Sequence, residues 1–190
     1  MEPFAFRELE TDRLLIKPFE ATFAQAEAFF RLITENRDFL TRYLFPLNDV
    51  RSAEDEFAFL EKAVAAWESH KDAQYGLWTR EGVLIGSCSL IHIHWEAQKG
   101  EIGYMLAQNQ TGKGYMAEAV HALENEFFAR GLNRIQIVMD VENKASENVA
   151  IRCGYKFEGI CRQSQFNTTL NAFRDLMFYS KLKSEWEKQS

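Results

Sequence analysis

A Gly-Lys-Gly turn, Gly112 to Gly114, leads without a break into a stretch whose apolar residues recur at helical spacing. Glycines that open a helix bring backbone N–H groups close to an anion, because no Cβ holds the anion away and the helix dipole attracts it. This stretch therefore predicts a phosphate-binding loop. Its contacts would come from the backbone of Gly112, Lys113, Gly114, Tyr115 and Met116. The Lys113 side chain would either add a charge contact or lie in solvent.

Two nucleotide-binding motifs fit this loop poorly. A P-loop needs a glycine five residues before Gly112 and a Ser or Thr after the lysine, but the chain has Ala107 and Gly114 there. The dinucleotide fingerprint matches Gly112, Gly114 and Ala117, with Asp140 further on. However, five residues separate the preceding strand from Gly112, and too few residues remain for more βαβ units. Two interpretations stay open: a loop that wraps a pyrophosphate at a helix N-terminus, and a plain glycine cap.

The elements around the loop follow from apolar spacing and from capping signals. Thr22 and the pair Ser52 and Asp55 are typical of helix N-termini, and Gly131 and Gly154 of helix C-termini. Strands are expected at 11–19, 74–80, 83–95, 101–106, 134–141, 155–166 and 172–182, and helices at 21–40, 52–70, 115–130 and 146–154, the last capped by Ser146. The order β-α-α-β-β-β-α-β-α-β-β predicts an α/β fold with a mixed sheet. The sheet would be antiparallel in its first half, with a βαβ crossover in the middle.

Composition limits the class of protein. The 190 residues suit one domain, 1–190, and 46% apolar with 26% charged residues are ordinary for a globular chain. A net charge of −6 argues against a general nucleic-acid binder, and no apolar run reaches the length of a membrane span. The acidic, mixed N-terminus fits neither a signal nor a transit peptide, and three cysteines without a CxxC pair are typical of reduced thiols. A cytoplasmic protein is expected.

Several motifs occur in an order and spacing that resembles one family. They are "EIGYML", "GKGYMAEA", "VENKASENVAIRCGYKFEG" and "FRDLMFYSKLKSEW", preceded by "TDRLLIKPF". Together they resemble the GNAT acetyltransferases over nearly the whole chain, in particular the RimJ/RimL-type ribosomal-protein N-terminal acetyltransferases. The resemblance implies the GNAT acyl-CoA N-acyltransferase fold with a splayed central strand pair, acetyl-CoA as co-substrate, and no metal. The loop departs from the family at Asn109, where Gln or Arg is frequent.

The resemblance also implies roles along the cofactor. The loop 112–116 would wrap the pyrophosphate, and the backbones of Met105 and Leu106 would pair with the pantetheine arm between two parted strands. One of those N–H groups would also stabilise the oxyanion of the tetrahedral intermediate. Asn143 would hydrogen-bond the arm, and Ser146 would donate a proton to the departing thiolate in addition to capping its helix.

Two positions depart from the family's proton-handling residues. Ala150 stands where many members have a tyrosine, and Gln165 stands where RimL-like members have a glutamate, so no base carries over. Glu101, which opens the strand beside the cofactor, is the expected replacement as general base, with an ion pair at the strand end as the alternative. His92 and His94 share one face of the neighbouring strand by alternation and are either further candidates for a base or packed or surface histidines. As a metal pair they lack a third ligand. The amine could also lose its proton to ordered water, with no dedicated residue.

The expected function is transfer of acetyl from acetyl-CoA to a primary amine by direct attack, with the N-terminal amine of a ribosomal protein as acceptor. The loops 44–50 and 167–173 would form walls of the acceptor groove. One alternative acceptor is a small amine, such as a polyamine or an aminoglycoside. Another alternative is a sensor module that binds acyl-CoA with little turnover, which the residues at 150 and 165 favour. Nucleic acid and membranes are not expected partners, and the resemblance is compatible with a homodimer.

Overall fold

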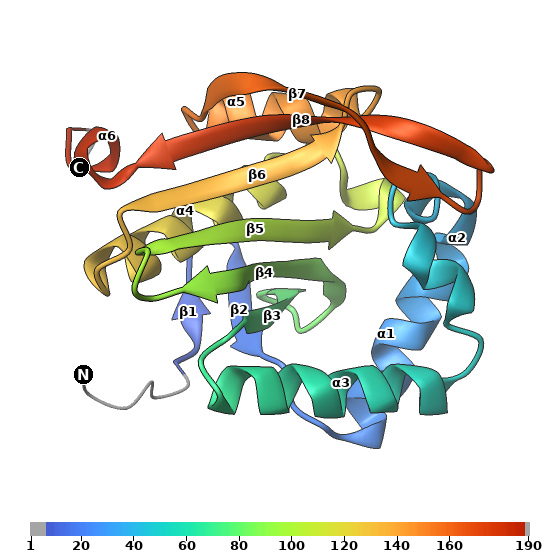
Figure 1. The fold of residues 1–190 in the computed structure, drawn as a ribbon. Coiled ribbons are helices and arrows are strands. Elements are labelled where there is room, and N and C mark those ends of the chain that lie inside the picture. Colours follow the sequence, from blue (N-terminus) through green and yellow to red (C-terminus); the bar gives the residue numbers. More distant parts are fainter. Residues whose placement is uncertain (1–6, 189–190) are drawn as a thin grey trace.

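The computed structural model describes residues 7–188 and is built around one eight-stranded sheet (Figure 1). The strand order in this sheet is β1-β2-β3-β4-β5-β6-β8-β7. The strands are β1 (Leu9–Glu10), β2 (Leu14–Pro18), β3 (Ala73–Thr79), β4 (Leu84–His94), β5 (Lys99–Leu106), β6 (Arg134–Asp140), β7 (Lys156–Asn167) and β8 (Ala172–Leu182). Neighbours are antiparallel except β5 and β6, which run parallel. The predicted mixed sheet is confirmed.

Helices cover both faces of this sheet (Figure 1). They are α1 (Phe23–Glu35), α2 (Arg37–Leu40), α3 (Ala53–Glu68), α4 (Tyr115–Ala129), α5 (Lys144–Arg152) and α6 (Lys183–Trp186), with 3-10 turns η1 (Phe45–Asp49) and η2 (Gln108–Gln110). α4 and α5 pack on one face, where Leu123, Phe127 and Ile137 belong to the larger core. α1 and most of α3 pack on the other face, where Phe29 and Leu60 form part of a smaller core.

The predicted helix ends agree with the structure where local signals are strong. The Thr22 hydroxyl accepts a backbone N–H in the first turn of α1. Ser52 and Asp55 form a reciprocal capping box at the start of α3. Gly131 and Gly154 follow α4 and α5 with φ of 105° and 79°, in the left-handed region that favours glycine.

Some predicted boundaries were wrong. The strand expected at 11–19 covers only Leu14–Pro18, because the hydroxyl of Thr11 accepts the Leu14 N–H at 3.0 Å and closes a turn before it. The helix expected at 21–40 is interrupted at Asn36. This side chain donates to the Leu32 carbonyl and accepts the N–H of Gln108, 72 residues away, so a tertiary contact holds the break.

The parallel pair β5 and β6 parts in its middle. The two strands pair only at Lys99 with Arg134, Gly100 with Ile135, and Glu101 with Gln136. Beyond Glu101, β5 continues beside β4 and β6 continues beside β8, but the two no longer pair with each other. The predicted splayed strand pair is therefore present, and it opens toward the N-terminal end of α4.

Candidate active site

The glycine loop ends in the first turn of α4. Gly112 and Gly114 have φ of 75° and 85°, in the left-handed region, where a residue with a side chain is strained. Gly114 is the N-cap of α4. The N–H of Glu118 bonds the Gly114 carbonyl at 3.1 Å. The N–H groups of Tyr115 and Met116 precede this bond, so the helix itself leaves them without acceptors. The start of the 15-residue helix is thus arranged to receive an anion.

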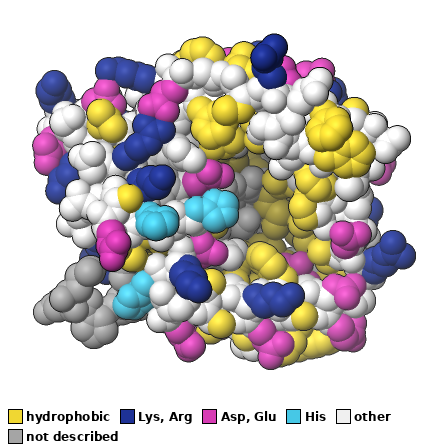
Figure 2. Space-filling model, viewed as in Figure 1, with side chains coloured by type: hydrophobic (Ala, Val, Ile, Leu, Met, Phe, Trp, Pro, Cys, Tyr) yellow, Lys and Arg dark blue, Asp and Glu magenta, His cyan; other side chains and the backbone are white. Residues whose placement is uncertain are grey.

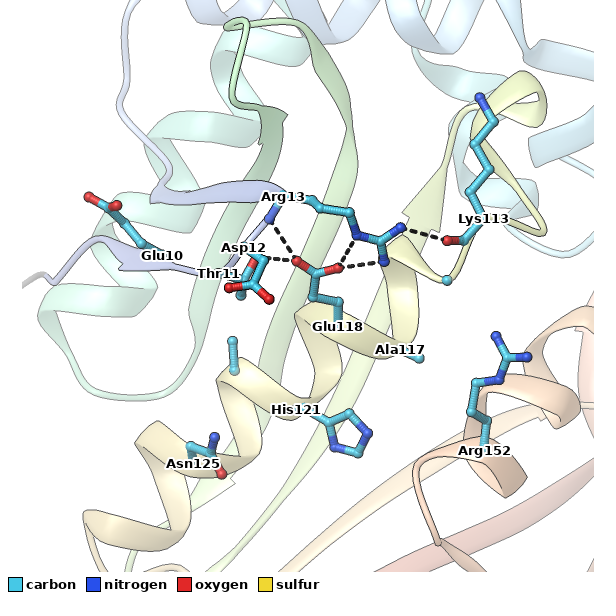
Figure 3. A pocket seen from close by; sticks show the side chains of 12 residues that line it. Glu10, Thr11, Asp12, Arg13, Lys113, Ala117, Glu118, His121, Asn125 and Arg152 are labelled. Atoms are coloured by element: carbon cyan, nitrogen blue, oxygen red, sulfur yellow. Dashed lines mark hydrogen bonds and ion pairs between the residues drawn. The ribbon is translucent and has the colours of Figure 1, made fainter. Parts of the chain in front are cut away.

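Arg13 holds this loop against the sheet (Figure 3). Its Nη1 donates to the Lys113 carbonyl at 2.9 Å, and its Nε donates to Oε2 of Glu118 at 2.6 Å. The other Glu118 oxygen accepts from the Arg13 backbone N–H at 3.0 Å and from the Thr11 hydroxyl at 2.5 Å. Although burial opposes the change, these donors lower the pKa of Glu118, so it stays ionised. The guanidinium also lies 4.6 Å from the centre of the Tyr115 ring.

An open pocket of about 780 Å³ lies beside the loop, between residues 10–13, α4 and the end of α5 (Figure 3). Arg13 and Arg152 approach Gly114 from two elements, and their guanidinium nitrogens lie 3.4 and 3.8 Å from where a Cβ of Gly114 would be. The Lys113 amine donates to Gln110 at 2.9 Å. Sequence analysis missed both arginines, because their only local signal is a positive charge. Arg13 is 100 residues from Lys113 in the chain.

Met105 and Leu106 form one wall of the parting. They pair with Ser87 and Gly86 of β4. A Cβ on Gly86 would lie 2.2 Å from the Met105 carbonyl oxygen, so only glycine allows this close approach. On their other side β6 has turned away, so an extended amide chain laid there would meet strand backbone, as the added strand of a sheet does.

Asn143, and not Ser146, caps α5. The Asn143 side-chain oxygen accepts the Ser146 N–H at 3.1 Å, which corrects the prediction that Ser146 is the cap. Asn143 is the N-cap because it lies three residues before the backbone N–H that needs an acceptor. The amide nitrogen of Asn143 makes no hydrogen bond within residues 7–188, and remains available to a ligand.

Ser146 therefore lies in the first turn of α5, with its side chain buried. Its Oγ is 2.7 Å from the phenol oxygen of Tyr104, which stands in the parted stretch of β5. Burial raises the pKa of Tyr104 well above its ordinary value, so the phenol is neutral. Sequence analysis missed Tyr104. The alternation of "EIGYML" was the available signal, because it places Tyr104 with Ile102 and Leu106 on the face of the larger core.

Glu101 lies at the last paired position before the strands part. Its Oε2 accepts from the Gln136 side chain of β6 at 2.8 Å, and no ion pair of Glu101 occurs among residues 7–188, in contrast to the alternative expected for it. Because residues 101 and 104 are three apart on one strand, their side chains lie on opposite faces. Glu101 is on the face of α1 and α3, and Tyr104 is on the face of α4 and α5.

The remaining candidates lie outside this arrangement. Ala150 is fully buried in the larger core, and Gln165 lies opposite Arg174 in the β7–β8 hairpin. His92 and His94 are both exposed, but His92 has a φ of 52° and the strand register shifts there, so simple alternation does not hold. Among residues 7–188, no three His, Cys, Asp or Glu side chains are grouped to hold a metal ion. None of the described helices has both the length and the apolar character of a membrane span.

One charged cluster was not expected from the sequence. Asp140 ends β6 and accepts two hydrogen bonds from Arg174, at 2.7 and 2.9 Å. Burial raises the pKa of Asp140, but the hydrogen bonds from Arg174 and from the backbone N–H of Glu142 outweigh burial, so the pKa is lowered. The cluster fixes the end of β6 to β8, immediately before the residues that lead to Asn143.

Comparisons with known proteins agree with this geometry. A family described as "Acetyltransferase (GNAT) domain" matches residues 13–156. The putative ribosomal N-acetyltransferase YdaF of Bacillus subtilis is 31% identical, over 85% of this chain and 88% of that protein. The ribosomal-protein-serine acetyltransferase of Escherichia coli is 29% identical, over 80% and 84%.

Solved structures have the same fold. The microcin C7 self immunity acetyltransferase MccE, in complex with acetyl-CoA and AMP, superimposes with a TM-score of 0.84 at 25% identity, over 90% of this chain and 93% of that chain. RimL, a ribosomal L7/L12 alpha-N-protein acetyltransferase in complex with coenzyme A, has a TM-score of 0.87 at 21% identity, over 93% and 98%. The match over residues 13–156, together with the parted strands and the glycine loop, leads to one conclusion: the chain belongs to the GNAT acetyltransferase family.

Proposed function

We propose that this acetyltransferase passes the acetyl group of acetyl-CoA directly to the N-terminal amine of a ribosomal protein. The observation that carries the reaction is the parting of β5 and β6 directly before the glycine loop. An extended, amide-bearing arm fits the parted strand, and a pyrophosphate fits the start of α4. The names and identities of the two bacterial relatives support the ribosomal acceptor.

The two faces of the sheet separate the two substrates. Tyr104 and Ser146 lie on the face of α4 and α5, where the pocket and Arg152 are also found. Glu101 lies on the opposite face, with α1 and α3. A thioester placed in the parting is therefore open to attack from the Glu101 side while its sulfur is next to Ser146.

Each residue then has a defined part in the reaction. Glu101 takes a proton from the incoming ammonium, and Gln136 keeps the carboxylate turned toward the parting. The amine nitrogen bonds to the carbonyl carbon, and a backbone N–H of Met105 or Leu106 stabilises the oxyanion. As the amide forms, the nitrogen loses a second proton to solvent on the Glu101 side. The C–S bond breaks with its electron pair on sulfur, and the Ser146 hydroxyl donates to that sulfur. Asn143 and the loop 112–116 hold the rest of the cofactor.

The Glu101 face offers room for a peptide end. Figure 2 shows this face hollowed, with hydrophobic side chains on the walls and acidic, basic and histidine side chains near the rim. One end is closed by two loops that meet: Asn48 donates to Thr169 at 2.5 Å, and Asn167 donates to the Arg42 carbonyl at 3.1 Å. These are the loops expected to wall the acceptor groove. Carboxylates near the rim attract a protonated amine, and apolar walls suit the first side chains of a peptide.

Acceptor competition tests the proposal. Purified protein is incubated with acetyl-CoA and one acceptor at a time, and the release of free thiol is measured. The acceptors are N-terminal peptides of ribosomal proteins, the same peptides with blocked N-termini, polyamines and aminoglycosides. We expect thiol release with the free peptides at a kcat/KM at least tenfold above that of any small amine, and none with the blocked peptides. A small amine with a higher kcat/KM than every peptide would overturn the ribosomal acceptor, but the assignment as an acetyltransferase would stand.

The same experiment separates the enzyme from an acyl-CoA sensor. Ala150 and Gln165 favour the sensor, since neither can move a proton. Tight acetyl-CoA binding by calorimetry without thiol release from any acceptor would establish the sensor. Loss of turnover in Glu101→Gln, with acetyl-CoA affinity retained, would support the base assigned here.

A further inference from the structure

Tyr104 of β5 and Ser146 of α5 form a hydrogen-bonded pair on the α4 and α5 face of the sheet. The two hydroxyl oxygens are 2.7 Å apart, and the phenol oxygen is 3.3 Å from the Ser146 carbonyl oxygen. The residues come from different walls, 42 positions apart in the chain. Tyr104 is in the stretch of β5 that β6 no longer covers, so the pair lies beside the space assigned to the thioester.

Either hydroxyl can be the donor of this hydrogen bond, and the available acceptors favour one direction. The phenol has one hydrogen to give. The Ser146 carbonyl lies within α5, where it already accepts the N–H four residues later, and it is the more distant of the two oxygens. The Ser146 Oγ is nearer and can accept while its own hydrogen remains free. The shorter distance therefore favours the phenol hydrogen on Oγ.

We propose that Tyr104 is a positioning residue for the reaction: it donates to Ser146 Oγ and thereby turns the Ser146 hydrogen toward the sulfur of the thioester. This inference rests on the proposed function, in which Ser146 donates to that sulfur. Without the phenol, the serine hydroxyl rotates freely among acceptors and offers its hydrogen to the sulfur for part of the time only.

The role is confined to the breaking of the C–S bond. The electron pair of that bond moves onto sulfur as the amide forms, and the hydrogen bond from Ser146 stabilises the developing thiolate. Tyr104 itself loses no proton, because a buried phenolate is unfavourable next to an uncharged serine. Glu101 holds the proton taken from the ammonium, and the second proton of the nitrogen passes to solvent on the same side of the sheet. The thiolate of the product takes a proton from solvent after release.

A double-mutant cycle tests this inference. Tyr104→Phe, Ser146→Ala and the double variant are compared in kcat and in KM for acetyl-CoA. Tyr179→Phe is the matched control, because the Tyr179 phenol also ties α5 to the sheet, through Glu147 at 2.9 Å, but from β8. Thermal melting of every variant shows whether the fold is intact.

We expect Tyr104→Phe to lower kcat about tenfold with KM for acetyl-CoA changed less than about twofold. In the Ser146→Ala background the same change should alter kcat less than about twofold, because the group that Tyr104 orients is gone. Tyr179→Phe should keep kcat near the wild-type value. Additive losses in the double variant, or an equal loss in Tyr179→Phe, would overturn the inference while wild-type turnover stands. Absence of thiol release by the wild-type protein would instead overturn the proposed function and this inference with it.

Discussion

Gly114→Ala separates the folding role of the glycine loop from its binding role. Among residues 7–188, an added Cβ in the free protein meets only Arg13 Nη2 at 3.4 Å and Arg152 Nη1 at 3.8 Å, which are ordinary contacts. The cost to folding is therefore the backbone strain of φ 85°, about 1–2 kcal/mol for a residue with a side chain. Gly82→Ala in the β3–β4 turn is the control, since Gly82 has φ 82° and its added Cβ has no neighbour within 4 Å in the described part of the chain.

Binding should distinguish the two variants. The new methyl group at Gly114 stands between two guanidinium groups, where the pyrophosphate is proposed to lie. It would hold the anion away from at least one backbone N–H, and a hydrogen bond to a charged acceptor contributes about 1.5–3 kcal/mol. That loss corresponds to an affinity for CoA lowered about 10- to 100-fold.

Calorimetric titration with CoA and urea unfolding measure the two effects. Both variants should lose a similar free energy of unfolding, and only Gly114→Ala should bind CoA more weakly. Equal CoA affinity in Gly114→Ala and Gly82→Ala would refute the pyrophosphate assignment.

Three further variants probe the supports of the site. Glu118→Gln should weaken CoA binding and lower the free energy of unfolding by about 1–2 kcal/mol, because the partly exposed carboxylate loses charge-assisted bonds to Arg13. An unchanged CoA affinity by titration would show that the glycine loop keeps its binding conformation without this contact. Burial raises the pKa of Glu56 to about 7, so the folded protein binds a proton that the unfolded chain has lost, and stability falls as pH rises from about 4.5 to about 7. Glu56→Gln should remove that fall, and urea unfolding should show it to be more stable than wild type at pH 8 by about 3 kcal/mol. The same dependence of the free energy of unfolding on pH in both proteins would contradict this prediction. Lys181→Met should cost about 3 kcal/mol, because it removes the fully buried amine 3.0 Å from the buried carboxylate of Glu124 and leaves His121, at 3.1 Å, as the partner of that oxygen. Adding Glu124→Gln should recover much of that loss, and a double variant no more stable than the single one would argue against the charge as its cause.

Local sequence signals predicted much of the fold. The capping box at Ser52 and Asp55, the cap at Thr22 and the glycines after α4 and α5 depend on atoms within about four residues, so the chain alone defines them. The strand expected at 101–106 is likewise present, as part of β5. The cap of α5 was misassigned because Asn143 and Ser146 are both good capping residues, and only the backbone angles at the helix start choose between them.

The sequence by itself determined the glycine loop, the order of the main elements and the family, because these features depend on residue types at separations of a few positions along the chain. The tertiary structure decided the contacts that complete the site. Arg13 reaches Glu118 across 105 residues, and Tyr104 reaches Ser146 across 42. Such pairs form only when the sheet twists, the helices pack on both faces and β5 parts from β6. Their residue types are common in any chain, and their meaning comes from the packing that brings them within hydrogen-bond distance.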